Sequence, residues 1–280
     1  MTIEAEPLTG TFGARVTGVD LTKPLAEPEA EQIAALLREH LVLVFRDQPV
    51  TPEQHIAFAR NFGPIKLPPV RTKHDGPPEM NVVSQVAPRG EGADDWHADN
   101  TYTEAPPAMS ILHVAELPEA GGDTMFANMY AAYEALSPAV QALCDGLTAT
   151  HDVTASVSKA IARGHSTADL AEIQQQLPPV VHPVVLAHPV TGRKALFVNV
   201  NSTVRINELT DAESAALLRM LFDHVKSPLF HLRVRWDESS IVMLDNLASQ
   251  HYAVPDYTTR RVLHRVAIAG PPIAIGRGRC

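Results

Sequence analysis

The residues of this sequence that are best suited to chemistry form an H-x-D motif, His97-Ala98-Asp99. On a strand the two outer side chains of such a motif point to the same face, because side chains alternate along a strand. One imidazole and one carboxylate directed at one point make two thirds of a 2-His-1-carboxylate site. His251 is the candidate third ligand. The three residues together predict an Fe(II) site that leaves one side open for oxygen chemistry.

A basic segment, Arg260 to Arg265, follows the third candidate ligand. Arg261 and Arg265 are four residues apart on a predicted strand, so their side chains share a face with Cα atoms about 13 Å apart. A guanidinium stays charged and can bind a carboxylate through two parallel hydrogen bonds. This face can therefore bind two separate anions, whereas Arg260 and His264 are expected on the opposite face.

Taken in order, these motifs resemble the taurine dioxygenase/TfdA family of Fe(II)- and 2-oxoglutarate-dependent dioxygenases. The resemblance extends almost from end to end of the chain. Its main matching pieces are Trp96-His-x-Asp99, Pro106-Pro107, Gly121-Gly-Asp-Thr124, Asp245-Asn246, Gln250-His-Tyr-Ala253 and Arg260-Arg-x-x-His-Arg265. It implies a mainly β fold with flanking helices, built on a double-stranded β-helix (jelly-roll, cupin-like) core.

The resemblance also implies roles for individual residues. His97, Asp99 and His251 would bind Fe(II), and Thr124 with Arg261 would bind the far carboxylate of 2-oxoglutarate. The implied reaction uses O2, releases succinate and CO2, and hydroxylates a C–H bond of a second substrate.

The same resemblance places Arg265 and Asn100 at the substrate, so we expect a small organic anion. Taurine enzymes have a sulfonate-binding histidine where this chain has Pro68, a tyrosine at Arg71 and an asparagine at Ala93. Each lost hydrogen-bond donor weakens recognition by about 1–3 kcal/mol. We therefore predict that taurine is a poor substrate, with another sulfonate or an alkyl sulfate ester preferred and an aryloxyalkanoate or other carboxylate as the alternative.

A jelly roll with two histidines and an aspartate could instead be a zinc hydrolase, or could bind a metal without catalysis. The discriminating feature is Arg261 with Thr124, because a hydrolase has no need of a second carboxylate site.

Composition narrows the class of protein further. The formal net charge is −9 and the pI is about 5.8, which argues against nucleic acid or an anionic membrane as partner. The sequence contains 2 cysteines, too few for a disulfide framework. Its first residues do not form a basic and apolar pattern, so we expect neither export nor membrane insertion. We expect one domain over residues 1–280 and a cytoplasmic location, and the family resemblance implies a homo-oligomer, either a dimer or a tetramer.

Apolar periodicity and capping residues define the elements that must position these groups. We expect helices over 28–40, 51–62, 128–136, 137–144 and 211–225, and strands over 41–45, 80–86, 110–117, 146–152, 194–199, 241–244 and 262–268. Two polar or proline-rich segments, 64–89 and 154–176, are predicted to be lids over the site, and the alternative for each is a surface excursion without a catalytic role.

Overall fold

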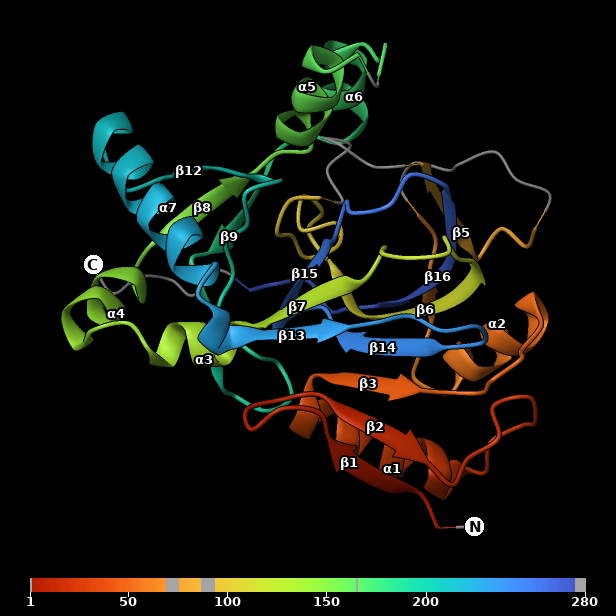
Figure 1. Ribbon diagram of the computed structural model, residues 1–280. Helices are drawn as coiled ribbons and strands as arrows, with labels where there is room; N and C mark the ends of the chain where they lie inside the picture. The colour runs from red at the N-terminus through yellow and green to blue at the C-terminus, as the bar shows by residue number, and fades with distance from the viewer. Residues whose placement is uncertain (1, 69–75, 87–93, 165, 275–280) are drawn as a thin grey trace.

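The computed structural model of the protein describes residues 2–68, 76–86, 94–164 and 166–274 (Figure 1). Its largest sheet is antiparallel except for the parallel pair β2–β3. In spatial order its strands are β1 (Glu4–Pro7), β2 (Ala14–Thr17), β3 (Val42–Phe45), β14 (Ile241–Asp245), β6 (Pro107–Glu116), β16 (Arg260–Ala269) and β4 (Ile65–Lys66), and β5 (Asn81–Val86) also pairs with β16.

A second antiparallel sheet consists of β13 (His231–Val234), β7 (Thr124–Asn128) and β15 (Ser249–Ala253). It packs against the large sheet, because Phe126 and Leu232 share one apolar cluster with Val42 and Val242. Two smaller sheets complete the fold. One consists of β12 (Thr203–Ile206), β8 (Thr148–His151) and β9 (Val180–Pro183), and the other of β10 (Val185–Ala187) and β11 (Lys194–Leu196).

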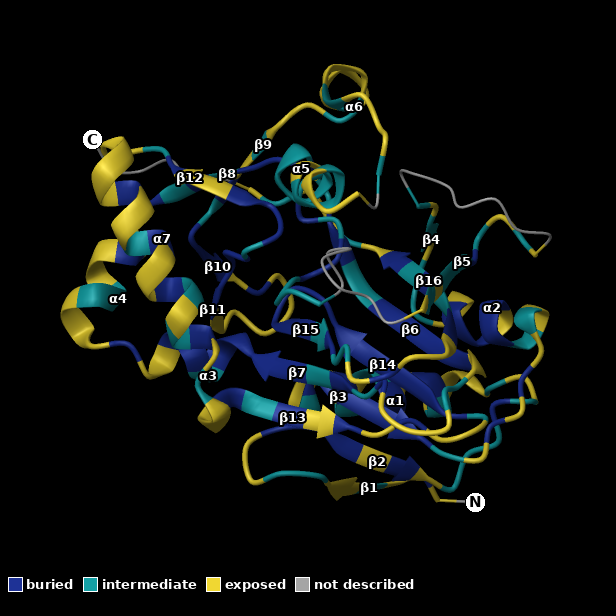
Figure 2. Cartoon of the chain, turned by 45° about the horizontal axis from the view of Figure 1, so that its top comes forward, coloured by how far each residue is buried: buried dark blue, intermediate teal, exposed yellow. Residues whose placement is uncertain are grey.

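The central strands β3 and β14 of the large sheet are buried on both faces. Helices α1 (Glu27–His40) and α2 (Pro52–Arg60) cover the outer face of this sheet. Along β3, Leu43 and Phe45 pack with these helices, whereas Val42 and Val44 point toward the second sheet. This double burial explains why β3 reads as a continuous apolar run rather than as an alternating one. Figure 2 shows the buried strands in dark blue.

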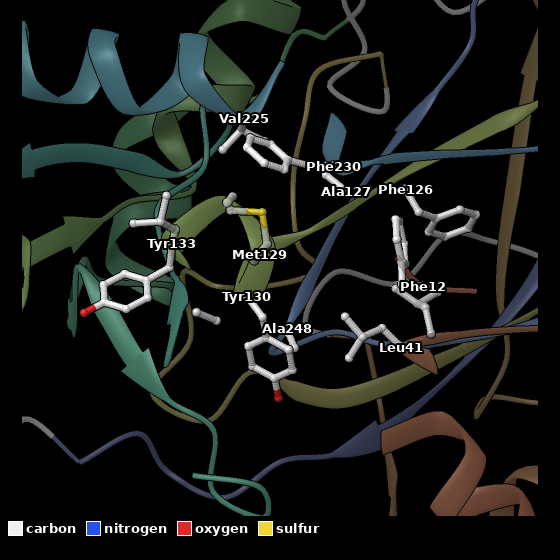
Figure 3. Packing of buried hydrophobic residues seen from close by; sticks show 14 of the residues in the cluster. Phe12, Leu41, Phe126, Ala127, Met129, Tyr130, Tyr133, Val225, Phe230 and Ala248 are labelled. Carbon is white, nitrogen blue, oxygen red and sulfur yellow. The ribbon is translucent and has the colours of Figure 1, made fainter. Parts of the chain in front are cut away.

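Helices α3 (Met129–Glu134), α4 (Pro138–Cys144) and α7 (Asp211–Val225), with the 3-10 turn η1 (Pro228–Phe230), pack at the end of the second sheet. Figure 3 shows part of this core, in which Met129 of α3 lies beside Val225 and Phe230. Helices α5 (Thr154–Ala162) and α6 (Leu170–Gln176) contact each other, and neither has a buried residue.

Most elements expected from the sequence are confirmed within a few residues. Helix α7 has the expected bounds, and its Thr210 hydroxyl accepts from the Glu213 backbone as a capping box requires. Within the predicted lid segment 64–89, β5 confirms the expected strand over 80–86 and β4 was not expected, whereas residues 69–75 and 87–89 lie outside the described residues. The strands over 124–128, 231–234 and 249–253 were not expected. Within the described ranges, no helix is long and apolar enough to cross a membrane.

Candidate active site

His97, Asp99 and His251 converge, with one potential ligand atom from each lying within 4.8 Å of the others. His97 and His251 form an antiparallel bridge in which each backbone N–H donates to the other carbonyl, at 3.1 and 2.7 Å. Because His251 lies in the middle of β15, this bridge sets the two imidazoles side by side, with ring centroids 4.2 Å apart.

Asp99 reaches the site by a different route from the one the sequence predicts. The H-x-D motif is not a strand, since only His97 makes a bridge and Asp99 begins a turn. The Asn246 side chain holds this turn: its Oδ1 accepts from the Asp99 backbone N–H at 2.7 Å, and its Nδ2 donates to the Asp99 carbonyl at 3.0 Å. The Ser110 hydroxyl donates to Asp99 Oδ2 at 2.8 Å, and Oδ1 lies 3.9 Å from His251 Nε2.

The protonation of these three groups suits a divalent metal ion. His97 Nδ1 lies 2.7 Å from the Asp95 carbonyl, so this nitrogen carries the hydrogen and Nε2 keeps its lone pair. Burial lowers the pKa of His251 to about 3, and it lowers the pKa of His97 as well. Burial opposes ionisation of Asp99, but Arg265 and the two histidines hold its pKa below the usual range. Two neutral imidazoles and one carboxylate are a fitting donor set for Fe(II).

Arg261 lies in the same cavity and is only 3% exposed. Its Nη2 donates to Thr124 Oγ1 at 2.9 Å, and Tyr257 is its other hydrogen-bond partner. Both partners are neutral, and within the described part of the chain no carboxylate is in ion-pair contact with Arg261. Burial lowers the pKa of Arg261, only partly offset by Tyr257 and Asp123. A buried cation with neutral partners favours binding of an anion.

Trp236 contacts both Thr124 and Arg261, a role that was not expected from the sequence. Its Nε1 donates to Thr124 Oγ1 at 3.0 Å, and the Arg261 guanidinium carbon lies 5.7 Å from its ring centroid. The Thr124 hydroxyl thus accepts two hydrogen bonds, which leaves its own hydrogen to donate to a ligand. The sequence offered one clue to Trp236, which is that tryptophan is rare in this chain, with only 2 residues.

The cavity lies between the two sheets. On β5, Gln85 and Val83 are opposite Arg261 and Leu263 of β16, so part of the segment predicted to be a lid is a wall of the site. The lining residues are Val83, Gln85, His97, Leu112, Thr124, Phe126, His251, Ala253, Arg261, Leu263 and Arg265.

Arg265 shares the cavity with Arg261, as the strand period predicts, and its Nη1 forms an ion pair with Asp99 Oδ1. Asn100 follows Asp99 with a left-handed backbone, at φ 51°, and Tyr102 donates to its side chain. Pro68 follows β4, whereas Arg71 and Ala93 lie outside the described residues.

Two further histidines have structural contacts away from the metal ligands. The buried His55 ring bonds to the Ile111 carbonyl, and the His231 ring bonds to the Val225 carbonyl. Arg260 is exposed and contacts Ser84.

The geometry describes a metal-binding jelly roll with a buried anion site beside its histidine and carboxylate triad. The sequence profile described as "Taurine catabolism dioxygenase TauD, TfdA family" matches residues 4–267, and the chain belongs to this family. The jelly-roll expectation is confirmed by similarity to solved dioxygenases of this type. One of these, a taurine dioxygenase from Burkholderia xenovorans, has a TM-score of 0.84 and 35% identity, covering 99% of this chain and 92% of that chain. A further similar structure, AAD-2 in complex with Mn(II) and N-oxalylglycine, has a TM-score of 0.84 and 32% identity, covering 98% of this chain and 100% of that chain.

Two sequence relatives differ in the substrates that their names give. The alpha-ketoglutarate-dependent 2,4-dichlorophenoxyacetate dioxygenase of Cupriavidus pinatubonensis is 35% identical, over 95% of this chain and 97% of the relative. The alpha-ketoglutarate-dependent sulfate ester dioxygenase of Pseudomonas putida is 32% identical, over 96% of this chain and 90% of the relative.

Proposed function

We propose that this protein is an Fe(II)- and 2-oxoglutarate-dependent dioxygenase that hydroxylates a small organic anion and releases succinate and CO2. The observation that carries the proposal is Arg261, a buried cation that lies in one cavity with His97 and His251 and whose hydrogen-bond partners among the described residues are neutral. A metal triad beside a separate anion site is the arrangement that a chelating dicarboxylate cosubstrate requires.

In this proposal His97, Asp99 and His251 hold Fe(II), which supplies activation of O2 coupled to decarboxylation of 2-oxoglutarate. Arg261 binds the far carboxylate of 2-oxoglutarate through its guanidinium, and the Thr124 hydroxyl donates to the same carboxylate. Trp236 keeps the Thr124 oxygen occupied as an acceptor, so that its hydrogen points to the ligand. Burial of this corner excludes water, which strengthens the contact between charges.

The second substrate is proposed to be an anion bound by Arg265 with the help of Asn100. A sulfonate or an alkyl sulfate ester is the preferred class, and an aryloxyalkanoate is the alternative. The names of the two relatives support both classes, since one acts on sulfate esters and the other on 2,4-dichlorophenoxyacetate.

A zinc hydrolase, or a jelly roll that binds a metal without catalysis, is disfavoured because neither uses the Arg261–Thr124 site. A single domain over residues 1–280, a cytoplasmic location and assembly into a dimer or tetramer stay predictions. The absence of nucleic-acid and membrane partners is likewise a prediction, based on the net charge of −9.

We also propose that residues 154–176 act as a lid. Lys159 of α5 binds Asp95 Oδ2 at 3.0 Å, and the Asp95 carbonyl in turn bonds to the ligand His97. This contact links α5 to the metal site through one residue. The segment 64–89 keeps its predicted lid role only outside β4 and β5, which are paired strands.

The test of the activity is to add Fe(II) and 2-oxoglutarate anaerobically, and then to screen succinate release in air across sulfonates, sulfate esters and aryloxy acids. A weak visible charge-transfer band and substrate-dependent succinate support the proposal. Asp99→Ala and His251→Ala should lose both signals, whereas His231→Gln, outside the site, should keep them. Tight Zn(II) binding with no band and no succinate would support the hydrolase class instead.

A further inference from the structure

The turn after Asp99 is held rigidly. Asn100 has a left-handed backbone, and its carbonyl accepts from both the Thr103 backbone N–H, at 3.1 Å, and the Thr103 hydroxyl, at 2.9 Å. Thr101 is tied down separately, because the Asn199 side chain donates to its hydroxyl at 2.9 Å and the His151 ring contacts the same oxygen at 3.1 Å. Asn100 is therefore presented from a backbone with little freedom to move.

The side-chain amide of Asn100 is held at its oxygen end by Tyr102. Tyr102 donates its hydroxyl to Asn100 Oδ1 at 2.9 Å, while no acceptor for Asn100 Nδ2 is found among the residues that the structure describes. Burial raises the pKa of Tyr102 to about 12, so its hydroxyl stays protonated and remains a donor at neutral pH. With Oδ1 occupied, the two Nδ2 hydrogens are the groups that Asn100 offers to a ligand.

The turn that carries this amide begins at the residue that pairs with Arg265. Asn100 directly follows Asp99, whose Oδ1 forms the ion pair with Arg265. The charges of Arg265 and Asp99 also act on the Tyr102 hydroxyl. Arg265 lowers its pKa and Asp99 raises it, and both effects are smaller than the effect of burial. An anion that binds Arg265 would therefore lie near the turn that carries the Asn100 amide.

We propose that Tyr102 is a positioning residue for substrate recognition, which fixes the Asn100 amide so that Nδ2 donates to the oxyanion bound by Arg265. This inference rests on the proposed function for the identity of the anion. A phenylalanine at this position would leave the amide free to rotate, and the rotated amide would present its carbonyl oxygen to the anion.

The arrangement favours a tetrahedral oxyanion with three terminal oxygens, as in a sulfate ester or a sulfonate. A guanidinium fork binds two oxygens of a carboxylate in one plane and so satisfies that group largely by itself. A sulfate has a third terminal oxygen outside this plane, which the Asn100 amide can bind. The Tyr102–Asn100 pair should thus matter more for a sulfate ester than for a carboxylate.

The experiment compares Tyr102→Phe, Asn100→Gly and the double variant. Glycine removes the amide but tolerates the left-handed backbone. Protein loaded with Zn(II) and 2-oxoglutarate is titrated anaerobically with hexyl sulfate and, separately, with 2,4-dichlorophenoxyacetate, and binding is measured by calorimetry without turnover. Tyr133→Phe is the matched control, because it removes a phenol hydrogen bond to Asp145 outside the site.

We expect Tyr102→Phe to raise the Kd for hexyl sulfate about fivefold to tenfold, as the loss of one hydrogen bond implies. In the Asn100→Gly background the same change should have less than about a twofold effect, and the Kd for 2-oxoglutarate should not change. Equal effects in both backgrounds, an unchanged Kd in Tyr102→Phe, or no binding of hexyl sulfate would each overturn the inference. An equal effect on 2,4-dichlorophenoxyacetate would refute the preference for a tetrahedral anion.

Failure of the inference and failure of the proposed function are distinguishable. Hexyl sulfate binding that depends on Tyr102 through Asn100, with no succinate released in air, supports the anion site and refutes the dioxygenase. Succinate release with a Kd that does not depend on Tyr102 refutes the positioning role alone.

Discussion

The side chain of Asn246 pairs with the backbone of Asp99 as a neighbouring strand would, accepting from its N–H at 2.7 Å and donating to its carbonyl at 3.0 Å. A further bond from Nδ2 to the Pro107 carbonyl, at 3.0 Å, fixes the amide, which is fully buried. Asn246 thereby takes the place of the strand that the H-x-D motif lacks, and it orients the carboxylate of the triad.

We therefore predict that Asn246→Ala weakens metal binding about 10- to 100-fold, the usual effect of losing a residue that orients a ligand. Calorimetric titration with Zn(II) measures this directly. Asn207→Ala is the control, because Asn207 bonds Thr148 and Thr150 away from the site. Unchanged Zn(II) affinity in a folded Asn246→Ala protein would show that the Asp99 turn holds its shape without the amide.

Arg261→Gln should raise the KM for 2-oxoglutarate much more than the KM for the prime substrate, since a neutral amide cannot reproduce a bidentate charged contact. Thr124→Val should act in the same direction more mildly. Trp236→Phe should resemble Thr124→Val, because it removes the donor that occupies the Thr124 oxygen. Succinate assays that vary each substrate in turn give both constants. An effect of Arg261→Gln on the prime substrate alone would show that the two arginines have exchanged roles.

Arg265→Ala should abolish turnover of the best substrate and should also destabilise the metal-free protein. The second effect follows because Asp99, buried and ionised, loses its ion-pair partner, at a cost of about 3–5 kcal/mol for a buried pair. A bound metal ion supplies a replacement charge, so the loss of thermal stability should be smaller when Zn(II) is present. Equal losses with and without metal would mean that Arg265 does not neutralise Asp99.

Pro68→His should improve taurine turnover relative to the best substrate, because proline offers no side-chain donor where taurine enzymes have a histidine. Wild-type enzyme should use taurine weakly. The measurement is succinate and sulfite release over a taurine concentration series, for both proteins. Saturation of the wild type at low taurine concentration would refute the prediction and indicate that other groups supply the missing contacts.

The metal-free protein should lose stability as the pH falls below about 6.5, partly because of His55. Burial lowers the pKa of His55 to about 3 from 6.5, with His113 adding to the effect. Between these values the unfolded chain binds a proton that the folded chain does not, so stability is present above pH 6.5 and decreases on acidification, by up to about 1.4 kcal/mol per pH unit for one group.

His55→Gln keeps a donor toward the Ile111 carbonyl and removes the titration. Urea unfolding at several pH values should therefore give a shallower pH dependence for this variant than for the wild type. Parallel curves would assign the acid sensitivity to other residues.

The sequence by itself determined the ligand types, the shared face of Arg261 and Arg265, and the elements whose signals are local. The capping box at Thr210 involves residues only three apart in the chain, so it can be recognised from the sequence. The apolar run of β3 reflects burial of the whole strand, which also shows in the sequence pattern. The order of the motifs along the chain was enough for the family.

Only the tertiary structure decided how these residues meet. Strands β7 and β15, which carry Thr124 and His251, are buried yet contain too many polar residues for an apolar pattern to predict them. The contacts of Trp236 with Thr124 and of Asn246 with Asp99 cross 112 and 147 residues of sequence. Strand pairing and sheet packing between distant segments bring such partners together. The local spacing of residues in the sequence therefore cannot predict them.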